Sequence, residues 1–266
     1  MQSANPNADE AYAFETNGYL VLPEFLPPDH VRRLLETLET TIARRRQLAQ
    51  DGIATNGETQ IDGPSTRIFH ILEESPDLLD AMDYPDLMTY VRSFLNPNPH
   101  FHASDAIWEV GTQPRDAGWH MDGMWGFGAL PRPIPHMQLK VGYYLSDMRE
   151  PDQGNLMLVP GSHRNPDPAM PSADQRGGFD TMPGAVQVCG PPGTTVMFHN
   201  AVWHTGGPRT RTDGSRIMLY YAYEHSFMMA GPEPWSYSPT FYAGLSPERR
   251  KLFHGFVFDP PELRYG

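Results

Sequence analysis

Several features that would place this chain in another class of protein are missing from its 266 residues. Cys189 is the only cysteine, so no disulfide can form within the chain, which suits a reducing compartment. No apolar run approaches the roughly 20 residues that a membrane-spanning helix needs. The N-terminal segment MQSANPNADEAYAF has neither the basic nor the apolar part of a signal peptide. These absences predict a cytoplasmic protein without a membrane anchor.

Positive charge is also scarce, and the formal net charge is -12. A phosphate backbone attracts a basic surface, so nucleic acid is not an expected partner. One or two local arginines can still hold a small anionic ligand. Nothing in the sequence indicates a partner protein, and a small molecule is the expected binding partner.

Proline and glycine, by contrast, are abundant, with 28 and 24 residues. Such numbers are high for a helical protein and normal for short strands joined by many turns. The hydrophobic fraction of 39% indicates a globular chain, and its length allows one substantial core. We therefore expect a mainly β protein with a helical layer.

The order of patterns along the chain supports this expectation. Apolar residues at helical spacing predict a helix from Pro28 to about Gln50, after a short strand at 19–25. A strand is predicted at 67–72 and one or two short helices at 76–94. From 101 onward short strands alternate with turns, at 101–110, 118–122, 137–146, 156–159, 185–189, 194–199, 203–206 and 215–223. This spacing without intervening helices indicates a sandwich or barrel.

The domain organisation predicted from these patterns is a single domain over residues 1–266. It comprises a helical part at 1–100, a β core at 101–225 and a C-terminal extension at 226–266. Two polar segments, 51–65 and 163–184, are expected to be loops. Loops of this kind can close over an active site.

A histidine and an aspartate stand two residues apart in GWHMDGMWG. In a strand, residues i and i+2 point to the same side, so His120 and Asp122 are expected to face one cavity. An imidazole and a carboxylate so placed can hold two adjacent positions on a divalent metal. An isolated H-x-D occurs by chance more often than it binds metal, so a further ligand is required.

The strongest third ligand is His204, in the β-rich run TVMFHNAVWHTGG. An antiparallel sandwich can bring this segment beside the first pair of ligands. His199, five residues earlier, is the rival. Two histidines and one carboxylate leave three positions open on an octahedral ion, which is the arrangement of non-haem Fe(II) oxygenases.

Arg216 opens the apolar strand SRIMLYYAY. An arginine whose head points inward needs a partner, and its planar guanidinium matches a carboxylate by two parallel hydrogen bonds. Arg216 is therefore predicted to anchor an acidic co-substrate, although a pairing with a nearby acid is the simpler explanation.

These motifs together resemble the phytanoyl-CoA dioxygenase family of Fe(II)/2-oxoglutarate oxygenases. The resemblance rests on the H-x-D pair, on QLKVGYYLSDMREPDQGNLMLVPGSHR at 138–164, on His204 followed by Thr-Gly-Gly, and on the later Arg216. It is strong over about 101–225, and FETNGYLVLPEFL followed by a helix is also typical.

The resemblance implies a jelly-roll core (a double-stranded β-helix), an iron site and 2-oxoglutarate as co-substrate, with O2 as oxidant. By position, His120, Asp122 and His204 would bind iron, and Arg216 would hold the distal carboxylate of 2-oxoglutarate. Two further residues would contact 2-oxoglutarate, namely Tyr143 and Thr205 (or the backbone of Gly206). The implied reaction is hydroxylation, or another oxidation, of an unactivated C–H bond with release of succinate and CO2. Because Asp122 retains the carboxylate ligand, halogenation is not expected, whereas desaturation, cyclisation and epoxidation stay open.

The substrate is expected to be a small, partly apolar or aromatic metabolite. Met124, Trp125 and Phe127 follow the first ligand pair, and Arg115 and Arg132 could meet a substrate carboxylate. Two other classes remain as alternatives. A metal-dependent cupin-like enzyme without 2-oxoglutarate would not need Arg216, and a non-catalytic β-sandwich binding protein would tolerate loss of any ligand.

Overall fold

The computed structural model describes residues 5–112, 115–123, 130–165, 177–228 and 237–253. Its centre is an antiparallel seven-stranded sheet in the order β1-β8-β5-β10-β4-β3-β2, facing a three-stranded sheet in the order β7-β6-β9. The large sheet comprises β1 (Tyr19–Leu22), β2 (Thr59–Asp62), β3 (Ser65–Phe69), β4 (Pro99–Val110), β5 (Gln138–Tyr144), β8 (Thr195–His199) and β10 (Ser215–His225). The small sheet comprises β6 (Leu156–Leu158), β7 (Val186–Gln187) and β9 (His204–Gly206). The two sheets form the jelly-roll core that the sequence predicts.

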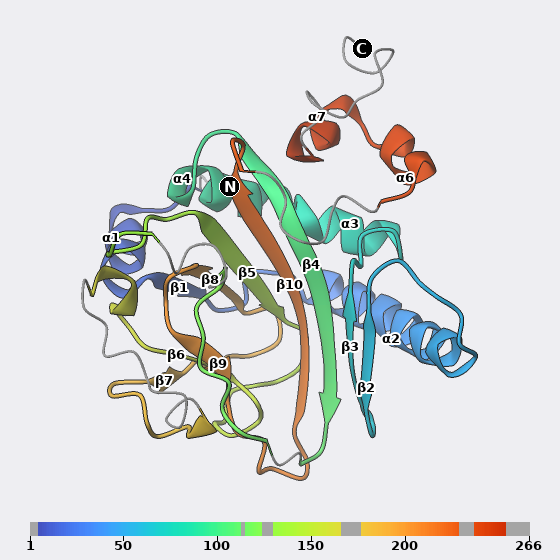
Figure 1. Cartoon of the computed structure of the whole chain (residues 1–266), viewed down its shortest axis with the longest axis horizontal. Helices are drawn as coiled ribbons and strands as arrows, with labels where there is room; N and C mark the ends of the chain where they lie inside the picture. The colour runs from blue at the N-terminus through green and yellow to red at the C-terminus, as the bar shows by residue number, and fades with distance from the viewer. Residues whose placement is uncertain (1–4, 113–114, 124–129, 166–176, 229–236, 254–266) are drawn as a thin grey trace.

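Helices cover one side of the large sheet. They are α1 (Ala8–Asn17), α2 (Pro28–Gln50), α3 (Pro76–Met82) and α4 (Pro85–Phe94), with α6 (Pro239–Gly244) and α7 (Pro247–Arg250) further along the chain. Two 3-10 turns, η1 (Ser162–Arg164) and η3 (Lys251–Phe253), complete the described elements. In Figure 1, α2 and α3 lie to one side of β4 and β10, and the small sheet lies to the other.

The helix predicted at 28–50 is confirmed, as are the two short helices within 76–94. Five of the helices begin at a proline, the residue whose fixed φ suits the first helical turn. Abundant proline therefore marks helix starts as well as turns. None of the helices among the described residues is long and apolar enough to span a bilayer.

Three differences from the sequence-based assignment concern short elements. Residues 118–122 form no strand, and only His120 makes a β-bridge there. The expected loop 51–65 contains β2, which pairs with β3 and extends the large sheet. The segment just before β2 is held by Arg45 of α2, whose guanidinium donates to the carbonyls of Asn56, Gly57 and Glu58. Helix α1, missed from the sequence, begins with a capping box between Asn7 and Glu10.

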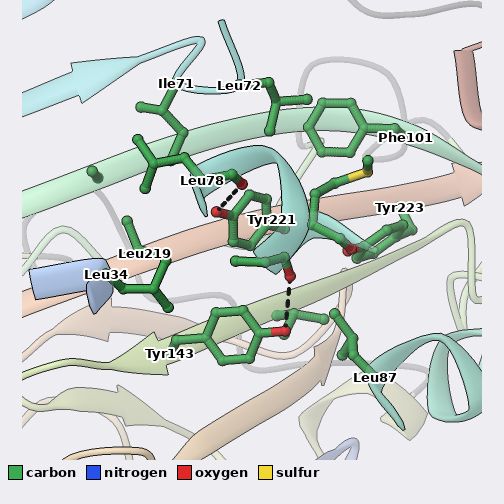
Figure 2. Close-up of a cluster of buried hydrophobic side chains, with 14 of the residues drawn as sticks. Leu34, Ile71, Leu72, Leu78, Leu87, Phe101, Tyr143, Leu219, Tyr221 and Tyr223 are labelled. Carbon is green, nitrogen blue, oxygen red and sulfur yellow. Dashed lines mark hydrogen bonds between the residues drawn. The ribbon is translucent and has the colours of Figure 1, made fainter. Parts of the chain in front are cut away.

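The main core lies between the large sheet and the helices. Side chains of Leu34, Leu78, Leu87 and Phe101 are buried there against Leu219 of β10, and Figure 2 shows the cluster. The tyrosines at positions 143, 221 and 223 donate their hydroxyls to the carbonyls of Ala81, Leu78 and Met82 in α3. A second core, containing Tyr144, Leu156, Val196 and Met218, fills the space between the two sheets. Successive residues of β5 and β10 therefore contribute to two different interiors.

Candidate active site

The His120 and His204 backbones form an isolated antiparallel bridge. Each N–H donates to the carbonyl of the other residue, at 3.0 Å and 2.9 Å. The two imidazole rings consequently lie 4.2 Å apart between centroids. One ligand atom from each of His120, His204 and Asp122 lies within 4.8 Å of the others. The structure thus brings together the three residues that the sequence selects as metal ligands.

Backbone carbonyls fix the orientation of both imidazoles. Nδ1 of His120 lies 2.6 Å from the carbonyl oxygen of Gly118, and Nδ1 of His204 lies 2.9 Å from that of Val202. Because a carbonyl only accepts, each Nδ1 carries the proton and donates. In the neutral form of each ring, Nε2 then has a free lone pair that a metal can bind.

The charge state of this group also suits a metal. Burial, and then the neighbouring His120, lowers the pKa of His204 to about 4, so its imidazole is neutral at physiological pH. Burial alone would raise the pKa of Asp122, but the positive charge of Lys140 is the main opposing cause, and the pKa of Asp122 is lowered. Neutral imidazoles and an ionised carboxylate are the ligand forms that bind a divalent ion. The donor set therefore fits Fe(II).

His199, the rival to His204, belongs to a different group of rings. It stacks on His136 at 4.3 Å and lies 5.0 Å from His163. Its Nδ1 accepts a hydrogen bond from the backbone of Ala201. His199 therefore packs on the helix side of β8, away from the three clustered ligands, and His163 packs against the carbonyl of Glu15 at 3.2 Å.

A cavity of about 290 Å³ opens beside the three ligands. This volume is at the lower end of the range for small-molecule sites. Arg216 lines the cavity and is 5% exposed. Its Nη1 lies 3.4 Å from Glu109 and its Nη2 lies 3.3 Å from the Tyr220 hydroxyl. Its Nε is buried without a partner among the described residues, so the guanidinium retains donor capacity for an acidic ligand.

Two more arginines stand close to Arg216. Arg115 and Arg209 reach Glu109 at 3.1 Å and 3.7 Å, so three guanidiniums share one carboxylate. Burial would raise the pKa of Glu109, but Arg216 and Arg115 outweigh burial and lower it. Gly206 makes room for this arrangement, because a Cβ there would meet Nη2 of Arg115 at 2.8 Å. This end of the cavity therefore carries an excess of positive charge.

The structure corrects the assignment of Tyr143. Its side chain is fully buried in the helix-facing core, and its hydroxyl donates to Ala81 at 3.1 Å. Tyr143 therefore points away from the cavity. The aromatic residue that the sequence analysis missed is Tyr220, which lines the cavity beside Arg216. Its signal was present, since positions 216 and 220 share one face of an uninterrupted strand.

Thr205 lines the cavity. Its Oγ1 accepts a hydrogen bond from the backbone N–H of Gly118 at 3.0 Å. Arg132 does not belong to the described cavity lining, and its Nη1 lies 3.9 Å from Sδ of Met121. Met124, Trp125 and Phe127 lie outside the described residues. Arg67 and Lys140 line the cavity and were not selected from the sequence.

Comparison with known proteins agrees with this geometry. The model of the phytanoyl-CoA dioxygenase (PhyH) family matches residues 14–218. Ectoine dioxygenase from Sphingopyxis alaskensis is 25% identical over 255 residues, covering 86% of this chain and 81% of the relative.

Two solved structures have the same fold. EctD from S. alaskensis, solved with 2-oxoglutarate and 5-hydroxyectoine, has a TM-score of 0.64 at 24% identity and covers 91% of this chain and 84% of its own. HygX from Streptomyces hygroscopicus, solved with nickel, 2-oxoglutarate and hygromycin B, has a TM-score of 0.63 at 20% identity and covers 84% and 89%. The family match spans most of the chain and includes both metal-ligand segments. This chain therefore belongs to the phytanoyl-CoA dioxygenase family of Fe(II)- and 2-oxoglutarate-dependent oxygenases.

Proposed function

We propose that this chain hydroxylates an unactivated C–H bond of a small, partly apolar metabolite, coupled to the conversion of 2-oxoglutarate and O2 to succinate and CO2. One oxygen atom enters the substrate and the other enters succinate. The observation that carries the proposal is the convergence of His120, Asp122 and His204 at a cavity that also contains the buried Arg216.

The protein's own residues perform binding and orientation in this proposal. His120 and His204 present Nε2, and Asp122 presents a carboxylate oxygen, to Fe(II). Arg216 and Tyr220 bind the distal carboxylate of 2-oxoglutarate, and Thr205 lines the same wall. When bound, Fe(II) and 2-oxoglutarate supply the redox chemistry that activates O2, and the protein aims it at the substrate.

Apolar side chains complete the cavity. Ile107, Leu156 and Phe198 line it next to the polar groups, which suits a substrate with an apolar part. The relative from S. alaskensis is an ectoine dioxygenase, and ectoine is therefore the first compound to test. The identity of 25% supports the reaction class, and the substrate itself is left to experiment.

The test uses purified protein loaded anaerobically with Fe(II) and 2-oxoglutarate and started with O2 and a panel of small metabolites. We expect succinate and a product 16 mass units heavier to form in equal amounts with one of them, measured by mass spectrometry. His120→Ala and Asp122→Ala should each abolish this coupling and lower the bound iron. Full turnover by His204→Ala would contradict the assignment of the ligands.

A further inference from the structure

Lys140 and Lys251 are the only two lysines in the chain, and their surroundings differ. Lys251 lies on the surface, 66% exposed, with its Nζ 3.0 Å from Glu248. Lys140 projects from β5 into the cavity, with a side chain 19% exposed. A largely buried ammonium is retained where it has anionic partners.

The described residues give Lys140 two carboxylates, Asp105 and Asp122, that interact with its charge, but no hydrogen-bond acceptor. Its closest acidic atom is Oδ1 of Asp105, at 3.7 Å, which is beyond hydrogen-bond distance. The other carboxylate oxygen of Asp105 already accepts two hydrogen bonds from Arg67, at 3.0 Å and 2.9 Å. Among the described residues, no acceptor forms a hydrogen bond with the three Lys140 donors. Neutralising Asp105 therefore does not account for Lys140.

The balance of charge around Lys140 and the three metal ligands also indicates that an anion is missing. Fe(II) bound by His120 and His204 would add two positive charges to those of Lys140 and Arg67. The anions that oppose them are Asp105, Asp122 and the keto-acid carboxylate of 2-oxoglutarate. One positive charge remains, and like charges brought together in a partly buried site raise the energy unless an anion joins them.

We propose that Lys140 binds a carboxylate on the organic substrate, so that the substrate is a small monocarboxylate with an apolar body. This inference rests on the proposed function, since it assigns a role within the same cavity. A single residual charge matches a monoanion rather than a phosphate ester, which carries more charge. Phe198, which faces Lys140 across the β5–β8 pair, and Tyr220, whose ring centroid is 5.7 Å from Nζ, form the wall for the apolar body.

The same ammonium could instead hold the keto-acid carboxylate of 2-oxoglutarate, and the experiment separates the two sources. The protein is labelled with 13C at Cε of lysine and loaded with Zn(II) in place of Fe(II), and the spectrum then contains two lysine signals. Lys251→Met identifies the signal of Lys140. After saturation with 2-oxoglutarate, matched pairs of acid and primary amide are titrated, beginning with phenylacetate and phenylacetamide and continuing with cyclohexanecarboxylate and its amide.

We expect at least one acid to shift the Lys140 signal saturably in the 2-oxoglutarate complex, whereas its amide leaves the signal in place. The Lys251 signal should not respond to either compound. A Lys140 signal that moves fully on addition of 2-oxoglutarate and then ignores every acid would assign the lysine to the co-substrate and overturn the proposal. A signal that responds to nothing would overturn it as well.

Binding measurements on variants give an independent result. Lys140→Met should weaken the binding of the responding acid at least tenfold, by calorimetry, and change the affinity for 2-oxoglutarate less than twofold. Lys140→Arg, which keeps the charge, should bind the acid with an affinity within threefold of that of the natural protein. Lys251→Met should bind the acid as tightly as the natural protein does. Equal weakening of acid and amide by Lys140→Met would assign the effect to cavity shape and refute the carboxylate contact.

Failure of the proposed function would look different. If neither Zn(II) nor 2-oxoglutarate bound, the assignment of the oxygenase site itself would be wrong. Normal binding of both, with a silent Lys140 signal, would remove only the inference about the substrate.

Discussion

The two faces of β10 carry out different tasks with similar residues. On the face toward the helices, Ile217, Leu219 and Tyr221 are buried in the main core. On the opposite face, Arg216 and Tyr220 line the cavity. Since neighbouring residues in a strand point to opposite sides, the division alternates residue by residue. A change of one position therefore decides whether a side chain supports the fold or meets the ligand.

The tyrosines make this contrast clearest. Tyr143 and Tyr223 donate to the carbonyls of Ala81 and Met82, in the last turn of α3. The last carbonyls of a helix have no donor within the helix, so these hydroxyls supply one. Figure 2 shows these rings pointing from the sheet toward the helix. Tyr220 lines the cavity on the opposite face, where its hydroxyl accepts from Arg216 and donates to Sδ of Met218. The same chemical group therefore satisfies carbonyls at the end of a helix on one face and contacts Arg216 in the cavity wall on the other.

The largest expected effect on the cavity face is that of Arg216→Met. The substitution removes the proposed carboxylate anchor and keeps the apolar stem. We expect the KM for 2-oxoglutarate to rise by about a hundredfold, since losing one buried charge-assisted contact costs about 2–5 kcal/mol. The measurement is succinate formation over a range of 2-oxoglutarate concentrations. Because Glu109 retains Arg115 and Arg209, the protein should stay folded. An unchanged KM would place the anchor elsewhere.

On the helix face, acid should act through the histidine cluster. Burial, and then the neighbouring His136, lowers the pKa of His199 to about 2, and burial lowers that of His136 to about 4. Both values lie below the 6.5 of an unfolded histidine, so below pH 6.5 the unfolded chain binds more protons. The free energy of unfolding should therefore fall by about 2–4 kcal/mol between pH 6.5 and 4.5. Urea titrations of the Zn(II)-loaded protein and of its His199→Phe variant would measure this, and equal pH slopes in both would contradict the assignment.

How far the sequence predicts the molecule follows from the same alternation. The ligands His120, Asp122 and His204 were recognised because their motifs are local. Tyr143 is expected only from the resemblance, and residues 145–153, which separate β5 from the next motif, form no strand, so the two-residue period does not carry across them. Counting within β10 from Arg216 reaches Tyr220 without a break. Lys140 could not be selected from the sequence for a different reason, because its charge interactions are with Asp105 and Arg67 from other strands.

Gly142 tests how tightly the cavity face is packed. It stands opposite Tyr220 in the β5–β10 pair, and a Cβ there would lie 2.7 Å from Cε1 of that ring. Gly142→Ala should therefore displace the ring, destabilise the fold by about 1–3 kcal/mol and raise the KM for 2-oxoglutarate severalfold. Thermal unfolding and succinate assays on one preparation would measure both. A stability loss without any change in KM would show that Tyr220 has no part in binding 2-oxoglutarate.

The most discriminating comparison uses two single-atom changes. Tyr143→Phe leaves the Ala81 carbonyl in the core without its hydroxyl donor, so the free energy of unfolding should fall by about 1 kcal/mol while the KM for 2-oxoglutarate stays constant. Tyr220→Phe removes a hydroxyl that lines the cavity, so the KM should rise about tenfold with little loss of stability. Urea titrations and succinate assays on both variants would separate the two roles. If the two substitutions changed the free energy of unfolding and the KM by the same amounts, the two faces of the sheet would not have separate roles, because stability and binding would then depend equally on both tyrosines.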